Sequence, residues 1–249
     1  MTARSSQPWF ATFFTGLANR FWADAVDVDQ TAEECAWMEA ALDVPEGAPL
    51  LDLACGRGRH AIPFARAGYA VTAVDLSAEE LAEGQAEAED LPITWLAADM
   101  RRLPADLRVA GAWCFGNSFG YLPREGTREM LAGLGRAVRQ GGRLLIDTAY
   151  VAEAILPNLE GRYWQEAGGV LCAIENDYDV ATSTLTCRYL FTAGGRSERK
   201  DMRCCVYTVA ELTALLDAAG FVVERLHGDC DGRPFELGDS RLLLAARRR

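Results

Sequence analysis

The sequence predicts an α/β fold built on a doubly wound parallel sheet, and three observations support this fold class. Short apolar segments alternate with helical segments between residues 50 and 149, which is the pattern of repeated βαβ units. Gly56 and Gly58 form a glycine-rich turn where the first strand meets a helix. A helix and two further strands follow residue 207, after a stretch that consists of β segments alone.

The composition is that of a large globular domain. The chain has 249 residues, and 36 acidic against 25 basic side chains give a net charge of −11. This length is ample for a packed core, whereas a nucleic-acid binder would need a basic surface. No apolar run approaches about 18 residues, and residues 1–8 lack the charged head and apolar core of a signal peptide. We therefore expect a cytoplasmic protein without nucleic-acid or membrane partners.

The cysteines and histidines give no sign of a metal site. The eight cysteines include no CxxC pair, and the two histidines and the scattered carboxylates form no ligand cluster. Several cysteines lie in apolar strand segments, where they pack as small apolar residues. We expect reduced thiols and no bound metal.

The N-terminal segment predicts two helices, over residues 9–24 and 31–42. The second begins with Thr31-Ala-Glu-Glu34, the pattern of a capping box. Aromatic residues in the first helix recur at spacings of three and four, which predicts an apolar stripe that docks this helix on the rest of the molecule. A second interpretation is that this helix folds over a bound cofactor as a lid.

The elements that follow alternate in type. Strands are predicted at 50–54, 70–75, 93–97, 111–115 and 143–149. Helices are predicted at 58–67, 78–87 and 124–139. Ser77-x-x-Glu80 is a second capping box at the start of the middle helix.

After residue 150 the pattern changes to consecutive β segments, at 162–166, 170–179, 185–191 and 199–207. Pairs of glycines between these segments indicate turns, so we expect an antiparallel insertion. A helix capped by Thr208 then ends before Gly220, and strands follow at 221–226 and 241–246. The predicted organisation is a helical cover (residues 1–44), a core (45–150 and 208–249) and a β cap (151–207) that shapes a substrate pocket.

The segment from Leu50 to His60 carries the strongest functional signal. Its glycines allow close approach of the backbone to a ligand and leave helix N–H groups facing it. Asp75, which ends the next strand, can accept both hydroxyls of a ribose. Asp99 and Met100 follow the third strand, where an acceptor beside an apolar wall suits an adenine ring. These residues predict a pocket for an adenosyl cofactor.

Two cofactor classes fit this pattern. Gly56-x-Gly58-x-x-Ala61 together with Asp75 also satisfies the dinucleotide fingerprint. A pyrophosphate requires positive potential, however, and the buried strand carries Asp52 instead. Since a carboxylate there suits a cationic amino group, we favour an adenosyl sulfonium.

The segment Asp52-Leu-Ala-Cys-Gly-Arg-Gly58 resembles the D-x-G-x-G-x-G loop of the class I S-adenosylmethionine-dependent methyltransferases. Asp75 resembles the ribose acid of that family, and Asp99 its adenine-side acid. The segment 113–122 is similar to the fourth-strand region of the small-molecule branch, and 207–221 is similar to the last helix and the entry into the sixth strand. Ala54 departs from the family pattern, which usually has glycine there.

This resemblance covers residues 45–249. It implies a Rossmann-like seven-stranded sheet of order 3-2-1-4-5-7-6 with the last strand antiparallel, and S-adenosyl-L-methionine as the cofactor, with S-adenosyl-L-homocysteine as the product. The cofactor site that we expect comprises Asp52, Ala54, Cys55, Gly56, Gly58, Asp75, Leu76, Asp99, Met100, Phe115 and Asn117.

Methyl transfer from a sulfonium needs alignment of the reacting atoms and exclusion of water, and it needs a base only if the acceptor must lose a proton. The candidate catalytic residues are His227, at the end of the sixth strand, and Tyr163 in the cap. The alternative for His227 is an ordinary surface-loop residue. Candidate substrate residues are Asn117, Tyr121, Arg203 and Tyr207. Inward-pointing arginines would favour a carboxylate- or phosphate-bearing substrate.

The predicted function is methyl transfer to a small molecule through an oxygen, nitrogen or carbon atom. An RNA methyltransferase is disfavoured by the charge, and Asn117-Ser-Phe-Gly stands where a base-modifying enzyme has an Asn/Asp-Pro-Pro-Tyr/Phe signature. A protein methyltransferase remains an alternative, because an acidic surface attracts basic peptides. Another is a non-catalytic protein that binds S-adenosylmethionine or uses its β cap mainly for oligomerisation. An exposed edge of the cap also predicts a homodimer.

Overall fold

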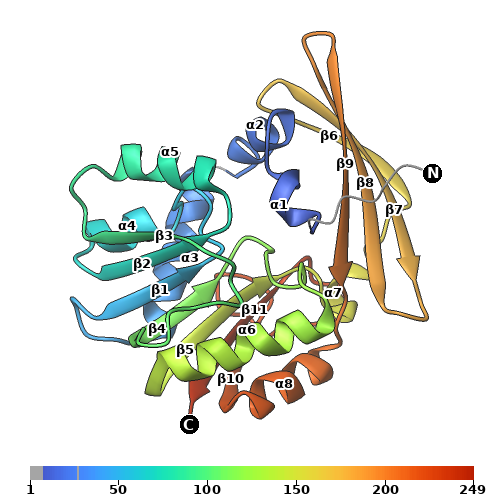
Figure 1. Ribbon diagram of the computed structural model, residues 1–249. Helices are drawn as coiled ribbons and strands as arrows, with labels where there is room; N and C mark the ends of the chain where they lie inside the picture. Colours follow the sequence, from blue (N-terminus) through green and yellow to red (C-terminus); the bar gives the residue numbers. More distant parts are fainter. Residues whose placement is uncertain (1–7, 27) are drawn as a thin grey trace.

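A seven-stranded sheet forms the centre of the molecule, as the computed structural model shows (Figure 1). The structure describes residues 8–26 and 28–249, so the predicted absence of a signal peptide concerns a segment that lies largely outside the described residues. The strand order is β3-β2-β1-β4-β5-β11-β10, which confirms the predicted order. β11 is antiparallel to both of its neighbours, and the other pairs are parallel. The strands are β1 (Pro49–Leu53), β2 (Ala70–Asp75), β3 (Ile93–Ala97), β4 (Val109–Cys114), β5 (Val138–Thr148), β10 (Phe221–His227) and β11 (Leu242–Arg248).

Helices cover both faces of this sheet. On one face lie α3 (Val28–Leu42), α4 (Ala61–Arg66) and α5 (Ala78–Ala88), which share an apolar core with the strands. On the other face α6 (Arg124–Ala137) and α8 (Val209–Ala218) form a second core. The central strands are buried on both sides, and for this reason they read as nearly continuous apolar runs.

Two N-terminal predictions are wrong in detail. The first predicted helix is divided into α1 (Phe10–Phe13) and α2 (Leu17–Ala23), because Gly16 between them has a φ of +63°. α3 begins at Val28, so Thr31 lies inside the helix and does not cap it. The carboxylate of Glu34, which was to complete that capping box, is buried and bound to other residues instead.

The other two helix starts behave as serine and threonine caps. Thr208 and Glu211 form a complete capping box at the start of α8. Ser77 accepts the N–H of Glu80 at 3.3 Å, but the Glu80 carboxylate contacts Asn19 and Arg57, so only half of that predicted box forms. β5 begins five residues before its predicted start, because Val138 is already extended where the helix prediction continued.

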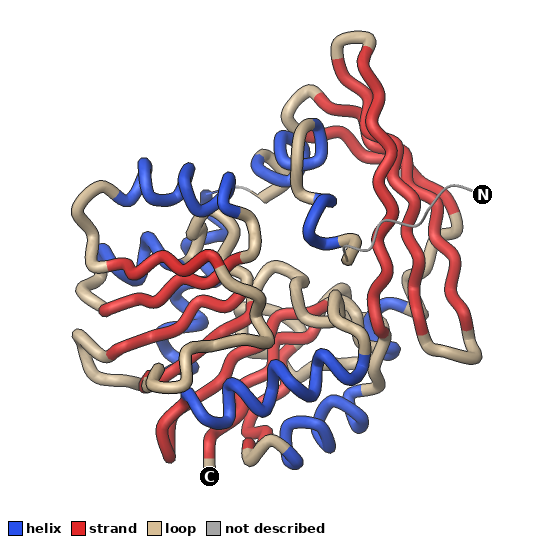
Figure 2. The backbone as a smooth tube through the Cα atoms, in the orientation of Figure 1, coloured by secondary structure: helices blue, strands red, loops and turns tan. Residues whose placement is uncertain are grey.

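The insertion is a separate four-stranded antiparallel sheet, as predicted. Its strands are β6 (Arg162–Ala167), β7 (Val170–Asp179), β8 (Thr184–Ala193) and β9 (Arg196–Cys205), in that order, and the short α7 (Ala152–Ile155) precedes them. α1 and α2 lie between this sheet and the central sheet (Figure 2). Their apolar side chains and the inner face of the cap form a third core.

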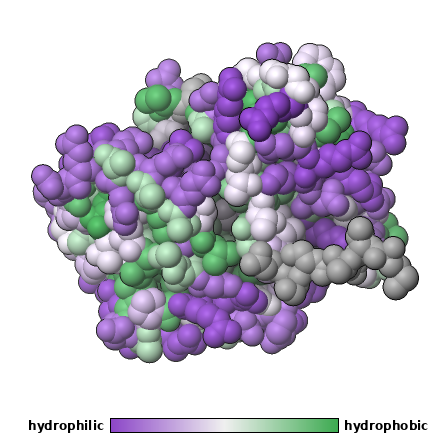
Figure 3. Space-filling model, turned by 45° about the horizontal axis from the view of Figure 1, so that its top comes forward, coloured by the Kyte–Doolittle hydropathy of each residue, from purple (hydrophilic) through white to green (hydrophobic). Residues whose placement is uncertain are grey.

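The outer surface is largely polar. Hydrophilic residues cover most of the face shown in Figure 3, in keeping with the net charge of −11. The outer face of the cap exposes Trp164 and Leu171, and the homodimer expected at the cap stays a prediction. Within the described part of the chain, no helix combines the length and apolar character needed to cross a bilayer.

Candidate active site

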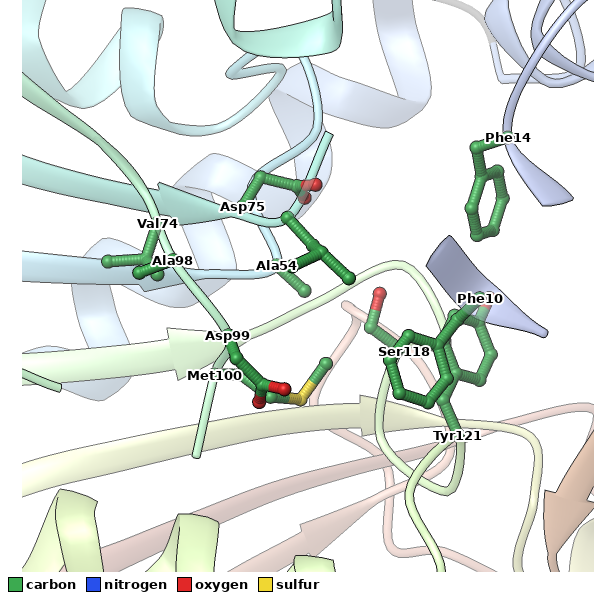
Figure 4. A pocket seen from close by; sticks show the side chains of 11 residues that line it. Phe10, Phe14, Ala54, Val74, Asp75, Ala98, Asp99, Met100, Ser118 and Tyr121 are labelled. Carbon is green, nitrogen blue, oxygen red and sulfur yellow. The ribbon is translucent and has the colours of Figure 1, made fainter. Parts of the chain in front are cut away.

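A pocket lies where the carboxyl ends of β1, β2 and β3 meet the loop after β4 (Figure 4). The space that no atom fills here is about 460 Å³, which includes solvent open to the pocket. Ligands of open α/β sheets bind at this edge, where the strand order reverses. The lining residues are Phe10, Phe14, Ala54, Val74, Asp75, Leu76, Ala98, Asp99, Met100, Ser118 and Tyr121.

The loop after β1 is shaped by left-handed backbone conformations. Gly58 has a φ of +86°, and a Cβ atom there would come within 2.5 Å of the Trp95 ring, so only glycine fits. Gly56 has a φ of +56°. Ala54 has a φ of +60°, although it carries a side chain that disfavours this region. The departure of Ala54 from the family's glycine therefore strains the backbone at a residue that lines the pocket.

Asp75 joins two loops at the centre of the pocket. Its Oδ2 accepts the N–H of Gly56 at 2.8 Å, and its Oδ1 accepts the N–H of Ser77 at 2.8 Å. Burial raises the pKa of Asp75, and these two N–H donors oppose that shift. Each oxygen keeps a lone pair that can accept a hydroxyl of a ligand.

Asp99 and Met100 stand at the third-strand end of the pocket. The Asp99 carboxylate accepts hydrogen bonds from Nε of Arg101 at 2.9 Å and from Nη2 at 2.5 Å. This guanidinium holds the pKa of Asp99 below its usual value. The pair is geometrically fixed, and Met100 adds an apolar wall beside it.

The fourth-strand side of the pocket is formed by Ser118 and Tyr121. Asn117 does not line the pocket. With a φ of +66°, it directs its Oδ1 to the N–H of Ala149 at 2.6 Å and so ties the loop to the end of β5. Burial raises the pKa of Tyr121 well above its usual value, so its hydroxyl stays protonated.

The N-terminal segment lines one side of the pocket. Phe10, Phe14 and Tyr121 lie together on this side, opposite Asp75 and Asp99 (Figure 4), and the rings of Phe14 and Tyr121 stack with centroids 6.1 Å apart. The Asn19 amide donates to Glu80 of α5 at 2.7 Å. Glu198 of β9 accepts the N–H of Leu17 at 3.0 Å. The cover therefore bridges the central domain and the cap.

Asp52 lies beneath the glycine loop, outside the lining. It is buried, and its Oδ2 has no hydrogen-bond partner within residues 8–26 and 28–249. Burial and the nearby charge of Asp75 raise the pKa of Asp52 to about 8. An unpaired buried carboxylate oxygen at this position fits the ammonium group of an amino-acid tail bound in the loop.

Five of the eleven predicted cofactor residues line the pocket, namely Ala54, Asp75, Leu76, Asp99 and Met100. Cys55, Gly56 and Gly58 form the loop itself, and Phe115 packs against Trp37 and His60 away from the pocket. Of the predicted substrate residues, Tyr121 lines it. Sequence reasoning did not assign Phe10, Phe14, Val74, Ala98 and Ser118, although the aromatic stripe of the first helix was a signal for the first two.

Four other predicted residues do not reach the pocket. His227 accepts a hydrogen bond from the Trp37 indole through Nδ1 at 3.0 Å, against α3. Tyr163 packs on the inner face of the cap, and Arg203 is exposed on β9. Tyr207 is buried and donates to Thr127 at 3.1 Å. Their assigned roles stay predictions that the geometry does not support.

The sheet has the order and the antiparallel β11 of a Rossmann-like fold. Its glycine loop after β1 lies beside acids that follow β2 and β3, which is the arrangement of enzymes that bind a nucleoside cofactor. The Methyltransferase domain family matches residues 50–142. An uncharacterized methyltransferase of Mycobacterium tuberculosis is 35% identical over 141 residues, which are 55% of this chain and 68% of that protein. The chain belongs to the class I S-adenosylmethionine-dependent methyltransferases, and S-adenosylmethionine is its cofactor.

Solved structures agree with this assignment at the level of the fold. The CcbJ methyltransferase from Streptomyces caelestis superposes with a TM-score of 0.81 at 18% identity, over 95% of this chain and 98% of that one. CalS10 from Micromonospora echinaspora, an amino pentose methyltransferase solved with S-adenosylmethionine bound, gives a TM-score of 0.67 at 21% identity, over 89% and 91%.

Proposed function

We propose that the protein methylates a small molecule held between the cofactor, the helical cover and the β cap. The observation that carries this proposal is the group of three aromatic side chains, Phe10, Phe14 and Tyr121, that narrows the pocket on the side opposite Asp75 and Asp99. A peptide or an RNA base would need an open path to the methyl group. The net charge of −11 also opposes RNA, and the similarity in fold to an amino pentose methyltransferase is in keeping with a small acceptor.

Each part of the chain has a task in this proposal. Residues 45–150 and 208–249 hold the cofactor, residues 1–44 cover it, and the cap of residues 151–207 bounds the acceptor space. The acids Asp75 and Asp99 accept the ribose hydroxyls and the adenine amino group, respectively, and the glycine loop allows close approach of the backbone.

The cofactor supplies a methyl group that its sulfonium has already activated. The residues of the chain align the acceptor for in-line displacement and exclude water from it. Ser118 and Tyr121 are the polar side chains on the acceptor side, and the protonated Tyr121 can donate a hydrogen bond but cannot take a proton. Within the described lining residues, both carboxylates are bound to N–H donors. This arrangement favours an acceptor that attacks without a protein base, such as an unprotonated amine.

Incubation with S-adenosylmethionine and three acceptor pools tests this proposal. The pools are small amines and amino sugars, basic peptides, and transfer RNA, and mass spectrometry detects added methyl groups. We expect transfer only in the small-molecule pool, with no transfer by Asp75→Ala. Methylation of peptide or RNA alone would contradict the proposal.

A further inference from the structure

A buried carboxylate, that of Glu34, accepts hydrogen bonds from two arginines and a histidine outside the pocket lining. Glu34 of α3 is 1% exposed and accepts hydrogen bonds from Nη1 of Arg59 at 2.6 Å, from Nη1 of Arg241 at 2.6 Å and from Nε2 of His60 at 2.9 Å. These donors hold the pKa of Glu34 well below its usual value, although burial alone would raise it. The carboxylate thus fixes two guanidinium groups at the carboxyl edge of the sheet.

Arg59 keeps part of its guanidinium available. Its Nη1 is bound to Glu34 and, at 3.1 Å, to the Thr31 hydroxyl. Its Nη2 has no hydrogen-bond partner among the residues that the structure describes, and its side chain is 27% exposed. This Nη2 points to Gly116, where a Cβ atom would lie 4.0 Å from it. Arg59 therefore stands between the loops after β1 and β4.

The two neighbouring arginines, Arg241 and Arg57, pair with other carboxylates. Arg241 uses Nη1 for Glu34 and Nη2 for Asp229 and the Cys230 sulfur. Arg57, in the same loop as Arg59, is bound to Glu80 and Glu83. Of these three, Arg59 is the one whose free terminal nitrogen lies beside Gly116, in the loop after β4.

The lining residues give the direction of the cofactor. Asp99 and Met100 lie at one end of the pocket, Asp75 and Ala54 in its middle, and Ser118 farther along (Figure 4). With adenine at the first end and ribose at Asp75, the amino-acid tail must extend toward the loop after β4. That tail carries a carboxylate, which needs a cation, and an ammonium group, which needs an acceptor such as the unpaired oxygen of Asp52.

We propose that Arg59 binds the carboxylate of the cofactor's methionine tail, and that Glu34 is the positioning residue that holds the guanidinium toward Gly116. Arginine suits this task because its planar fork matches a carboxylate. Since the tail belongs to the cofactor, the outcome does not depend on which acceptor the protein methylates.

Calorimetry with three ligands tests the proposal. S-adenosylhomocysteine has the whole tail, its decarboxylated form lacks only the carboxylate, and 5′-methylthioadenosine lacks the tail altogether. We expect the wild type to bind S-adenosylhomocysteine about 10- to 100-fold more tightly than the decarboxylated form, the range for hydrogen bonds to a charged group. Arg59→Gln should remove this preference and leave binding of 5′-methylthioadenosine unchanged, whereas Arg59→Lys should retain part of it.

Arg57→Gln is the matched control, because it removes the same charge from the same loop and should keep the wild-type preference. Glu34→Gln should reduce the preference, since it frees the guanidinium from its fixed orientation. Equal wild-type affinity for S-adenosylhomocysteine and its decarboxylated form would overturn the proposal, whatever the stability of the variants. Equal losses for all three ligands in Arg59→Gln would also overturn it, because they would indicate a purely structural role.

Discussion

The carboxylate of Asp75 accepts the backbone N–H of Gly56 at 2.8 Å, across 19 residues of sequence. This bond joins the loop after β1 to the loop after β2, so the acid expected to bind the ribose also sets the position of the glycine loop. The two features that identify the family in sequence are therefore one unit in the structure.

Removal of the Asp75 carboxylate is expected to abolish tight cofactor binding. Asp75→Ala loses the ribose acceptor and the anchor of Gly56, so the dissociation constant of S-adenosylhomocysteine should rise by at least about 100-fold, as expected for two lost charge-assisted hydrogen bonds. Calorimetry measures this, with Asp106→Ala in an exposed turn as the control. Unchanged affinity in Asp75→Ala would exclude this role.

Replacement of Ala54 by glycine is expected to stabilise the protein. The left-handed φ of +60° disfavours alanine by about 1–2 kcal/mol, and the greater freedom of glycine in the unfolded chain offsets about half of that. The melting temperature of Ala54→Gly should therefore rise by about 2–4 °C. The same change at the exposed helical residue Ala132 should lower it. A lower melting temperature for Ala54→Gly would show that the loop is not strained there.

The buried carboxyl group of Asp52 should make the free energy of unfolding depend on pH. Burial, followed by the charge of Asp75, raises its pKa to about 8 in the folded state, whereas the unfolded carboxyl ionises near pH 4. Between these values the folded state binds a proton that the unfolded state has released. The contribution of Asp52 to stability is therefore greatest in acid and is lost as the pH rises from about 4 to about 8.

Asp52→Asn should remove this dependence. The free energy of unfolding of the variant, relative to wild type, should increase by about 1 kcal/mol or more between about pH 5 and pH 8.5. Denaturant titrations at several pH values measure the difference, with Asp106→Asn as the control. A difference that stays constant with pH would argue against a raised pKa.

The hydrogen bonds that hold α2 to α5 and to β9 predict how fast trypsin cleaves the N-terminal segment. Arg20 is an exposed trypsin site on α2, next to Asn19, which is bound to Glu80. S-adenosylhomocysteine should slow cleavage after Arg20, because a filled pocket supports Phe10 and Phe14. Asn19→Ala should speed cleavage in the free protein by several-fold, as expected for one lost hydrogen bond. Mass spectrometry of timed digests follows both effects, and identical digestion with and without ligand would remove the lid interpretation.

The alternation of short strands and helices predicted the sheet well. β2, β3 and β7 begin and end where the sequence indicated. The signals that mark their ends, which are the spacing of apolar residues and the neighbouring turn residues, lie within the same short stretch of sequence. The reversed last strand and the strand order came from the resemblance to a family and not from periodicity.

Contacts between distant segments escaped prediction. The position of His227 at the end of a strand predicts a catalytic role. In the structure the Trp37 indole, 190 residues away in sequence, donates a hydrogen bond to its ring. Glu34 was assigned to a cap, but it binds Arg241 across 207 residues. A single sequence shows which residues end a strand. It does not show which distant side chain forms a hydrogen bond with them.

The cluster around Glu34 has a consequence for sequence divergence. Loss of this carboxylate alone would leave Arg59 without a carboxylate partner and Arg241 with Asp229 alone, in a poorly hydrated region, which is destabilising. Substitution of either arginine alone would leave the acid short of a partner. Lineages should therefore keep positions 34, 59 and 241 together or exchange them together, so that they are inherited as a block.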